Sequence, residues 1–211
     1  MSSESGTNNR RLHVLGVSGS LRRASFNSGL LRASKQMATD MMDVTIFDLR
    51  DIPFYDGDVE AEGDPASVTA LKAAVRQADA VIFATPEYNY GTSGVLKNAV
   101  DGMPRDREPD SLMGKPATII GAGGRAGTAR AQMQLRETLA ETGAIVMVKP
   151  GVLVFAFAPM KFDEDGNLTD QETQTLVGKH MAEFANWIIK VGNPREFSRF
   201  ACEMDIQVAR R

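Results

Sequence analysis

Three segments of the sequence combine hydroxyl, glycine and aromatic residues in patterns suited to ligand binding. The first, residues 16–27, reads GVSGSLRRASFN and runs from an apolar stretch into a helical pattern. Its hydroxyls and the free N–H groups of a helix start suit a phosphate monoester. Arg22 or Arg23 can add a charge-assisted hydrogen bond. The alternative is ordinary capping by Ser25 or Asn27. Capping needs one such residue and this segment supplies several, so we predict a phosphate site.

The second segment, residues 85–94, reads TPEYNYGTSG. Two tyrosines, a proline and glycines at the end of an apolar run can present a flat wall and exposed backbone groups to a planar ring. The pyrimidine edge of a flavin would suit such a wall. The alternative is that the aromatic rings merely pack on the domain surface or on a partner subunit.

The third segment, residues 121–127, reads GAGGRAG and matches the dinucleotide pattern G-x-G-x-x-A. We reject a dinucleotide fold on this match because it follows the fourth apolar run rather than the first. The next strand also ends in Val154-Phe155-Ala156, without an acidic residue for a ribose. We expect these glycines to let the backbone approach a flat ligand that the other two segments hold.

Several other chemistries are disfavoured. The first segment lacks the lysine of a nucleoside triphosphatase loop, and G-x-S-x-G fails around both Ser18 and Ser93. His13 and His180 fall within a predicted strand and a predicted helix, where we expect packing or interface roles rather than a catalytic base. Cys202 is the one cysteine, so neither an intrachain disulfide nor a multi-cysteine metal site is expected.

The elements around these segments alternate. Apolar runs at 12–17, 44–49, 80–85, 117–121 and 145–154 predict strands, and their continuous hydrophobicity is typical of parallel strands covered on both faces. Between them, four helical faces are expected, marked by Leu30, Ser34, Met37 and Met41; by Val68, Leu71, Val75 and Ala78; by Gln132, Leu135 and Leu139; and by Leu176, His180, Phe184, Trp187 and Ile188. A further helix is expected at 95–103. This order predicts an α/β fold with a doubly wound sheet of five parallel strands.

In such sheets the ligand lies beyond the carboxyl ends of the strands, where the strand order reverses. The three segments follow the first, third and fourth predicted strands and would meet at that edge. The long polar connection 50–65 is expected to form part of the rim of the site.

Composition limits the remaining function classes. The 211 residues carry 24 Lys and Arg against 27 Asp and Glu, a net charge of 24 − 27 = −3, so strong nucleic-acid binding is not indicated. Residues 1–11 are polar and are expected to be a disordered leader. No stretch approaches a membrane span. With one cysteine in the chain, these features predict a cytoplasmic protein without membrane or nucleic-acid partners.

Four motifs in order, SGSLRRASFN, TPEYNYGTSGVLKNAVD, GAGGRAGTARAQMQLRETL and FDEDGNLTDQET, resemble the NADPH-dependent FMN reductase family, which includes quinone, chromate and azo-dye reductases. The resemblance covers residues 12–191, with 192–211 as a C-terminal extension. It implies a flavodoxin-like fold of three layers, with strand order 2-1-3-4-5 and the flavin at the switch between the first and third strands.

The resemblance also implies a set of FMN contacts. Ser18, Ser20, Arg22, Ser25, Phe26 and Asn27 would hold the phosphate and its approach; Pro86, Glu87, Tyr88, Asn89 and Tyr90 would line the ring; Gly121, Gly123 and Gly124 would close its other side. Two residues depart from the family pattern: Ser93 replaces a frequent proline and Gly102 a frequent tryptophan. We expect these changes to alter the ring edge and subunit packing.

The implied activity is hydride transfer from NADPH, or NADH, to N5 of bound FMN and then to a small acceptor: free FMN, a quinone, an azo compound or chromate. No side chain need act as acid or base, because the flavin carries the chemistry, and no metal is expected. Residues 95–103 and 128–142 resemble the subunit faces of a homodimer or homotetramer. Residues 192–211 would cover a neighbouring subunit or form a surface helix.

The alternative is a non-enzymatic flavodoxin-like electron carrier. Such carriers are commonly strongly acidic, so a net charge of −3, with Arg22, Arg23 and Arg125 near the site, argues weakly against it.

Overall fold

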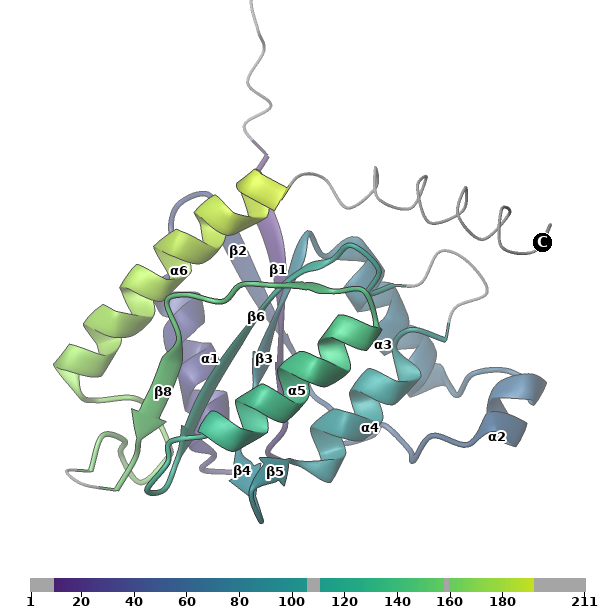
Figure 1. Cartoon of the computed structure of the whole chain (residues 1–211), viewed down its shortest axis with the longest axis horizontal. Helices are drawn as coiled ribbons and strands as arrows, with labels where there is room; N and C mark the ends of the chain where they lie inside the picture. Colours follow the sequence, from purple (N-terminus) through teal and green to yellow (C-terminus); the bar gives the residue numbers. More distant parts are fainter. Residues whose placement is uncertain (1–9, 106–110, 158–159, 192–211) are drawn as a thin grey trace, which may run out of the picture.

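The computed structural model describes residues 10–105, 111–157 and 160–191. Its centre is a parallel sheet in the order β2-β1-β3-β6-β7, with β8 also paired to β6 (Figure 1). The strands are β1 (Leu12–Ser18), β2 (Met42–Phe47), β3 (Ala80–Ala84), β6 (Pro116–Gly123), β7 (Ile145–Val146) and β8 (Val152–Phe155). The predicted order 2-1-3-4-5 is confirmed, as is the reversal of strand order between β1 and β3.

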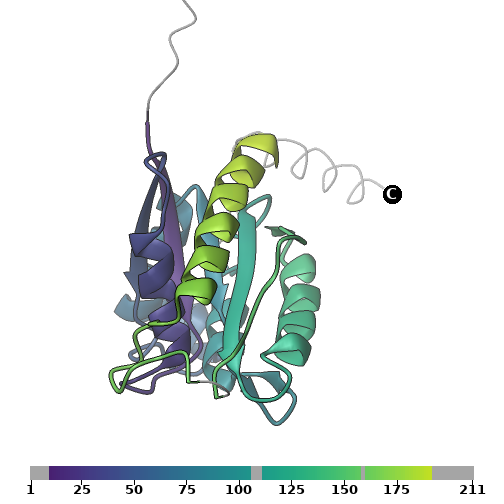
Figure 2. The ribbon, with the colours of Figure 1, turned by 90° about the vertical axis from the view of Figure 1, so that its left-hand side faces the viewer.

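Helices cover both faces of the sheet. On one face, α1 (Phe26–Gln36) and α6 (Gln171–Val191) share a core cluster with strand residues such as Val14. On the other, α3 (Ala66–Gln77), α4 (Gly94–Gly102) and α5 (Ala129–Glu141) pack with residues such as Leu15. Figure 2 shows α5 and α6 on opposite sides of β6. Successive strand residues enter opposite clusters, which explains why the strands read as continuous apolar runs.

The fifth predicted strand, 145–154, is wrong as a single element. β7 pairs with the start of β6, and β8 pairs with its end. Pro150 lies between them, and a proline has no N–H to donate to the ladder. The two short strands therefore flank an interruption that divides one apolar run.

Three local features also differ from the sequence expectations. The first helical face was expected to reach Met41, but α1 ends at Gln36, and Met37 packs against the core from the capping position instead. The connection 50–65 contains a short helix, α2 (Gly57–Glu62), which Asp56 caps. A small antiparallel hairpin, β4 (Glu87–Tyr88) and β5 (Gly91–Thr92), lies within the second segment.

The ends of the predicted domain lie partly beyond the described residues. Residues 1–9 of the expected leader and the expected extension 192–211 fall outside them. Arg10 is paired with Asp79, and Arg11 Nη2 donates to the carbonyl of Met42 (2.6 Å). Over the ranges that the structure describes, no helix is both long and apolar enough to cross a membrane.

Candidate functional site

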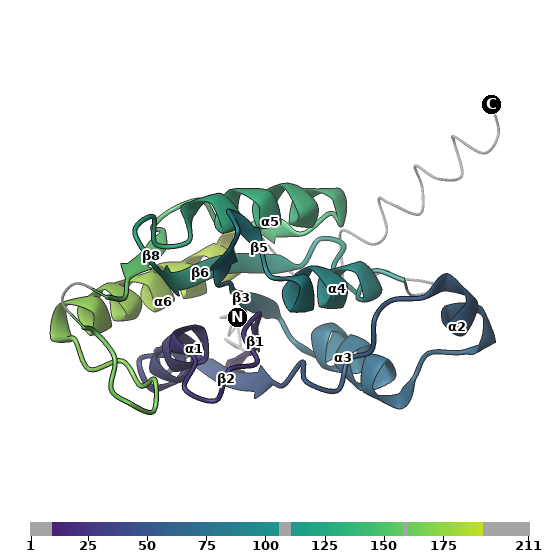
Figure 3. The same cartoon turned by 90° about the horizontal axis from the view of Figure 1, so that it is seen from below.

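The three predicted segments meet beyond the carboxyl ends of the strands, the edge that Figure 3 views from below. Backbone bonds join them: Gly19 N–H donates to the carbonyl of Ala84 (2.9 Å), and Thr85 N–H to that of Ile120 (3.0 Å). A pocket of about 280 Å³ opens there. It is lined by Ser20, Arg22, Ser25, Phe26, Asn27, Pro86, Glu87, Tyr88, Ala122, Gly123, Gly124 and Phe157. Ten of the fourteen predicted contacts are in that lining.

The serines of the first segment build the start of α1. Ser25 caps the helix, its Oγ accepting from Ser28 N–H (3.2 Å). Ser18, in β1, does not line the pocket: its hydroxyl accepts from Ser20 N–H (3.3 Å) and bonds the Ser28 hydroxyl (3.1 Å). The capping alternative is therefore correct for the Ser25 hydroxyl. Phe26 and Asn27 follow in the first turn of α1 and line the pocket, and N–H groups at this position of a helix have no intrahelical acceptors.

Arg22 lies against the wall of the pocket. Its Nη2 donates to the carbonyl of Ala24 (2.7 Å), and its guanidinium lies 5.0 Å from the centre of the Phe26 ring. Phe26 in turn stacks on Phe162 (4.6 Å) and meets Phe157 edge-on (5.6 Å). An exposed cation is therefore held beside the helix start by an aromatic support.

Glu87 and the hairpin form the second wall. Its carboxylate accepts from the backbone N–H of Arg130 (3.0 Å) and of Ala131 (3.3 Å) at the start of α5, and from Arg130 Nη1 (2.8 Å). Burial opposes ionisation of this carboxyl, but these hydrogen bonds outweigh it and hold the pKa of Glu87 below its usual value. Glu87 therefore fixes the hairpin to α5 as a carboxylate.

The two residues of the hairpin turn, Asn89 and Tyr90, have φ of 50° and 68°. Positive φ at both positions is the geometry of a type I′ turn. Tyr88 is exposed at the pocket, and Tyr90, which is 73% exposed, has the Arg130 guanidinium 3.9 Å from its ring centre. Asn89 and Tyr90 line an adjoining groove rather than the pocket itself.

The glycines of the third segment have different surroundings. A Cβ at Gly121 would collide with Thr128 and lie 2.7 Å from the carbonyl oxygen of Thr85, so this glycine permits close packing inside the sheet edge. Gly121 does not line the pocket. At Gly124, by contrast, a Cβ would meet nothing within 4 Å, so the backbone there faces open space beside the pocket.

The groove is continuous with the pocket, because Glu87 and Gly124 line both. Its volume is about 650 Å³ and its other lining residues are Asn89, Tyr90, Arg125, Ala126, Gly127 and Arg130.

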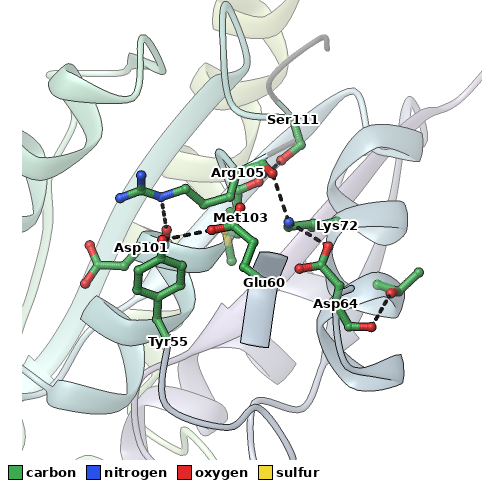
Figure 4. A network of polar contacts seen from close by, with 9 residues as sticks. Tyr55, Glu60, Asp64, Lys72, Asp101, Met103, Arg105 and Ser111 are labelled. Atoms are coloured by element: carbon green, nitrogen blue, oxygen red, sulfur yellow. Dashed lines mark hydrogen bonds and ion pairs between the residues drawn. The ribbon is translucent and has the colours of Figure 1, made fainter. Parts of the chain in front are cut away.

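A separate apolar cavity lies between α3, α4 and the connection 50–65, with a volume of about 110 Å³. Around it, Lys72 Nζ donates to Asp64 Oδ2 (2.7 Å) and the Arg105 carbonyl (3.2 Å), and the Tyr55 hydroxyl bonds Glu60 (2.8 Å) (Figure 4). It includes no residue of the three segments, and its volume is less than half that of the pocket where they meet. We therefore interpret the hydrogen bonds of Lys72 and Tyr55 as contacts that hold the connection 50–65 in place.

Sequence reasoning missed Ala122, Phe157 and Arg130. Ala122 lies between two predicted glycines, and its residue type gives no sign of a role in the site, because its hydrogen bonds to Asn27 are made by its backbone. Phe157 and Arg130 approach from segments whose position depends on tertiary packing. Within the described part of the chain, no group of three His, Cys, Asp or Glu side chains could hold a metal ion.

Comparison with known proteins gives consistent matches. The model of the family described as NADPH-dependent FMN reductase matches residues 12–158. NAD(P)H-dependent FMN reductase PA1204 of Pseudomonas aeruginosa is 42% identical over 178 residues, 84% of this chain and 95% of that protein. Quinone reductase of Escherichia coli strain K12 is 39% identical over 185 residues, 86% and 97% of the two chains. Among solved structures, the flavoenzyme NAD(P)H:(acceptor) oxidoreductase FerB of Paracoccus denitrificans has a TM-score of 0.77 at 34% identity, covering 86% of this chain and 99% of that one.

Proposed function

The chain belongs to the NADPH-dependent FMN reductase family, and we propose that the pocket between its three loops is where it holds FMN. It is an FMN-dependent NAD(P)H oxidoreductase, and FMN and NAD(P)H are its cofactors. The observation that carries the site assignment is the convergence of the three loops on one pocket at the strand-order switch between β1 and β3.

The residues of the pocket fit the two ends of FMN. At the phosphate end, the first turn of α1 offers N–H groups, and Ser20, Ser25 and Arg22 add hydroxyls and a cation. At the ring end, Pro86 and Tyr88 form a flat wall, and the exposed backbone at Gly124 allows close approach. We assign Gly123 with Gly124 to the opposite side of the ring.

Four predicted residues take indirect roles in this proposal. Ser18 and Gly121 position the loops, Ser18 through Ser20 and Ser28 and Gly121 through close packing. Asn89 and Tyr90 lie beside the ring in the groove.

Bound FMN supplies the hydride chemistry, and the protein supplies its position and surroundings. The loops bind the phosphate and line the ring, and they leave part of the ring open towards the adjoining groove, so dinucleotide and acceptor can reach the same open part in turn. We propose a small quinone or free FMN as the acceptor, with azo compounds and chromate as further substrates.

We further propose a homodimer or homotetramer assembled through α4 and α5, in the cytoplasm. The exposed outer surfaces of these helices, including Met133 at 74% exposure, and a single cysteine in the chain support this. A particle mass of one chain at micromolar concentration would contradict the assembly.

The test is an anaerobic absorption spectrum of the FMN-loaded protein before and after addition of NADPH, and separately of NADH. Rapid bleaching of the flavin bands is expected, followed by recovery on addition of a quinone. A stable yellow complex that ignores both dinucleotides would instead support the electron carrier, which the net charge of −3 does not favour.

A further inference from the structure

We propose that the groove beside the flavin pocket binds the phosphate-bearing half of the nicotinamide dinucleotide, and that Arg125 binds one of its phosphates. The proposal rests on the assignment of FMN to the adjoining pocket. Arg125 would then be a residue that recognises the hydride donor, and neither the fold nor the sequence motifs identify such a residue.

The first argument is continuity. A nicotinamide placed on the open face of the flavin must lead the rest of the dinucleotide out through an adjoining space. The groove shares Glu87 and Gly124 with the pocket and extends past the hairpin turn to the start of α5. Its volume of about 650 Å³ is within the range of ordinary small-molecule sites.

The second argument is charge. Arg125 is exposed at the groove, and among the described residues it has no hydrogen-bond or ion-pair partner. The one carboxylate of the groove, on Glu87, is already bonded to Arg130 and to two N–H groups of α5. The groove therefore carries an unneutralised guanidinium, a group whose planar set of donors matches phosphate oxygens.

The third argument is Tyr90, an aromatic residue that lines the same groove. Tyr90 is 73% exposed and adopts a φ of 68°, which is uncommon for a residue with a bulky side chain. Glu87 holds Arg130, and Arg130 lies 3.9 Å from the centre of the Tyr90 ring. An exposed ring that is fixed by a strained turn and a cation is a suitable stacking surface for a purine.

The dinucleotide contains two kinds of phosphate that Arg125 could bind, and variants distinguish them. Arg125→Ala, Arg125→Lys and the wild type are loaded with FMN and assayed with NADPH and with NADH. Loss of one charge-assisted contact should raise KM by about tenfold or more, with kcat little changed. A rise for NADPH alone identifies the 2′-phosphate; an equal rise for both identifies the pyrophosphate. Arg125→Lys should retain part of the affinity.

A binding measurement without turnover completes the test. Calorimetric titration of the FMN-loaded protein with adenosine 2′,5′-bisphosphate and with ADP should show Arg125→Ala weakening the corresponding probe by about tenfold. Tyr90→Asn, which tolerates positive φ, should weaken both probes severalfold through loss of stacking. The matched control is Lys35→Ala, which removes one exposed positive charge from the last turn of α1, at the other end of that helix from the pocket.

Unchanged KM and unchanged probe affinities in Arg125→Ala would overturn the proposal. So would loss of FMN retention in that variant, because Arg125 would then belong to the flavin pocket. Failure of the proposed function looks different: the wild type would fail to retain FMN or to bleach with either dinucleotide.

Discussion

The side-chain amide of Asn27 pairs with the backbone of Ala122 in both directions. Ala122 N–H donates to Asn27 Oδ1 (2.9 Å), and Asn27 Nδ2 donates to the Ala122 carbonyl (3.0 Å). Asn27 lies in the first turn of α1, which follows β1, and Ala122 lies near the end of β6. In the sheet, β3 separates β1 from β6. One buried side chain therefore joins the first and third segments at the proposed flavin pocket, which both residues line, and fixes the distance between these segments.

Asn27→Ala should destabilise the protein and weaken FMN binding together. The change leaves a buried N–H and a buried carbonyl of Ala122 without partners, which costs about 2 kcal/mol or more in the free energy of unfolding. Urea unfolding of the apo protein measures the first effect, and FMN titration measures the second. Ser34→Ala is the control, because the Ser34 hydroxyl donates to the Leu30 carbonyl within α1 (2.8 Å) and joins no two segments of the pocket. Wild-type stability in Asn27→Ala would contradict this role.

Arg22→Ala should weaken FMN retention without unfolding the domain. Arg22 is exposed, and its contacts within the described residues are local, to Ala24 and Phe26, so its loss should change the free energy of unfolding by less than about 0.5 kcal/mol. Loss of a charge-assisted bond to the phosphate should raise the FMN dissociation constant by about tenfold or more. Fluorescence titration of the apo protein with FMN and with riboflavin separates the two ends of the ligand. Riboflavin affinity should stay unchanged, and an unchanged FMN affinity would remove the phosphate assignment.

The parts of the fold that were predicted correctly depend on local sequence. Strands buried on both faces must be apolar throughout, so β1 and β3 can be recognised as continuous apolar runs. The position of the loops after them, at the ligand edge of the sheet, then follows from the topology. The break between β7 and β8 was missed because hydrophobic residues continue on both sides of Pro150. The end of α1 was missed because Met37 is apolar for core packing beyond the helix rather than within it.

The parts of the site that were missed depend on contacts between distant segments. The turn at Asn89 and Tyr90 lacks the Asn-Gly pair that usually marks a two-residue hairpin, so no local pattern predicts β4 and β5. The hydrogen bonds that tie the Glu87 carboxylate to α5, more than forty positions later in the chain, are likewise not visible in the local sequence. The residue types show which side chains are able to bind a ligand. Which of these side chains are free to do so depends on their tertiary contacts.

Gly29→Ala should destabilise the protein, although alanine favours helices. In an exposed helix interior this substitution stabilises by up to about 1 kcal/mol. At Gly29, however, a Cβ would run into the carbonyl oxygen of Gly166, in the segment that carries Phe162 to the Phe26 ring. We expect a loss of about 1–3 kcal/mol in urea unfolding. Gly178→Ala in α6 is the matched control, because its Cβ meets nothing within 4 Å, and it should be neutral or stabilising. The same sign for both variants would refute the packing argument.

His180 should make the protein lose stability in mild acid. Its Nδ1 lies 2.8 Å from the carbonyl of Pro150, which can only accept, so Nδ1 carries the proton and Nε2 accepts from the Thr118 hydroxyl at 3.0 Å. Burial disfavours the charged ring and outweighs the Pro150 carbonyl, so the pKa of His180 falls from its usual 6.5 to about 4.

Between pH 6.5 and 4 the unfolded chain therefore binds a proton at His180 that the folded chain does not. The stability that the neutral ring contributes is complete above pH 6.5 and is lost as the pH falls towards 4, by about 3 kcal/mol in all. Because carboxylates also titrate in this range, the test compares urea unfolding of the wild type and His180→Gln at pH 7 and pH 4.5. The variant should be less stable than the wild type at pH 7, and it should lose less stability on acidification. Equal acid losses in the wild type and His180→Gln would mean that a protonated ring is accommodated at this position.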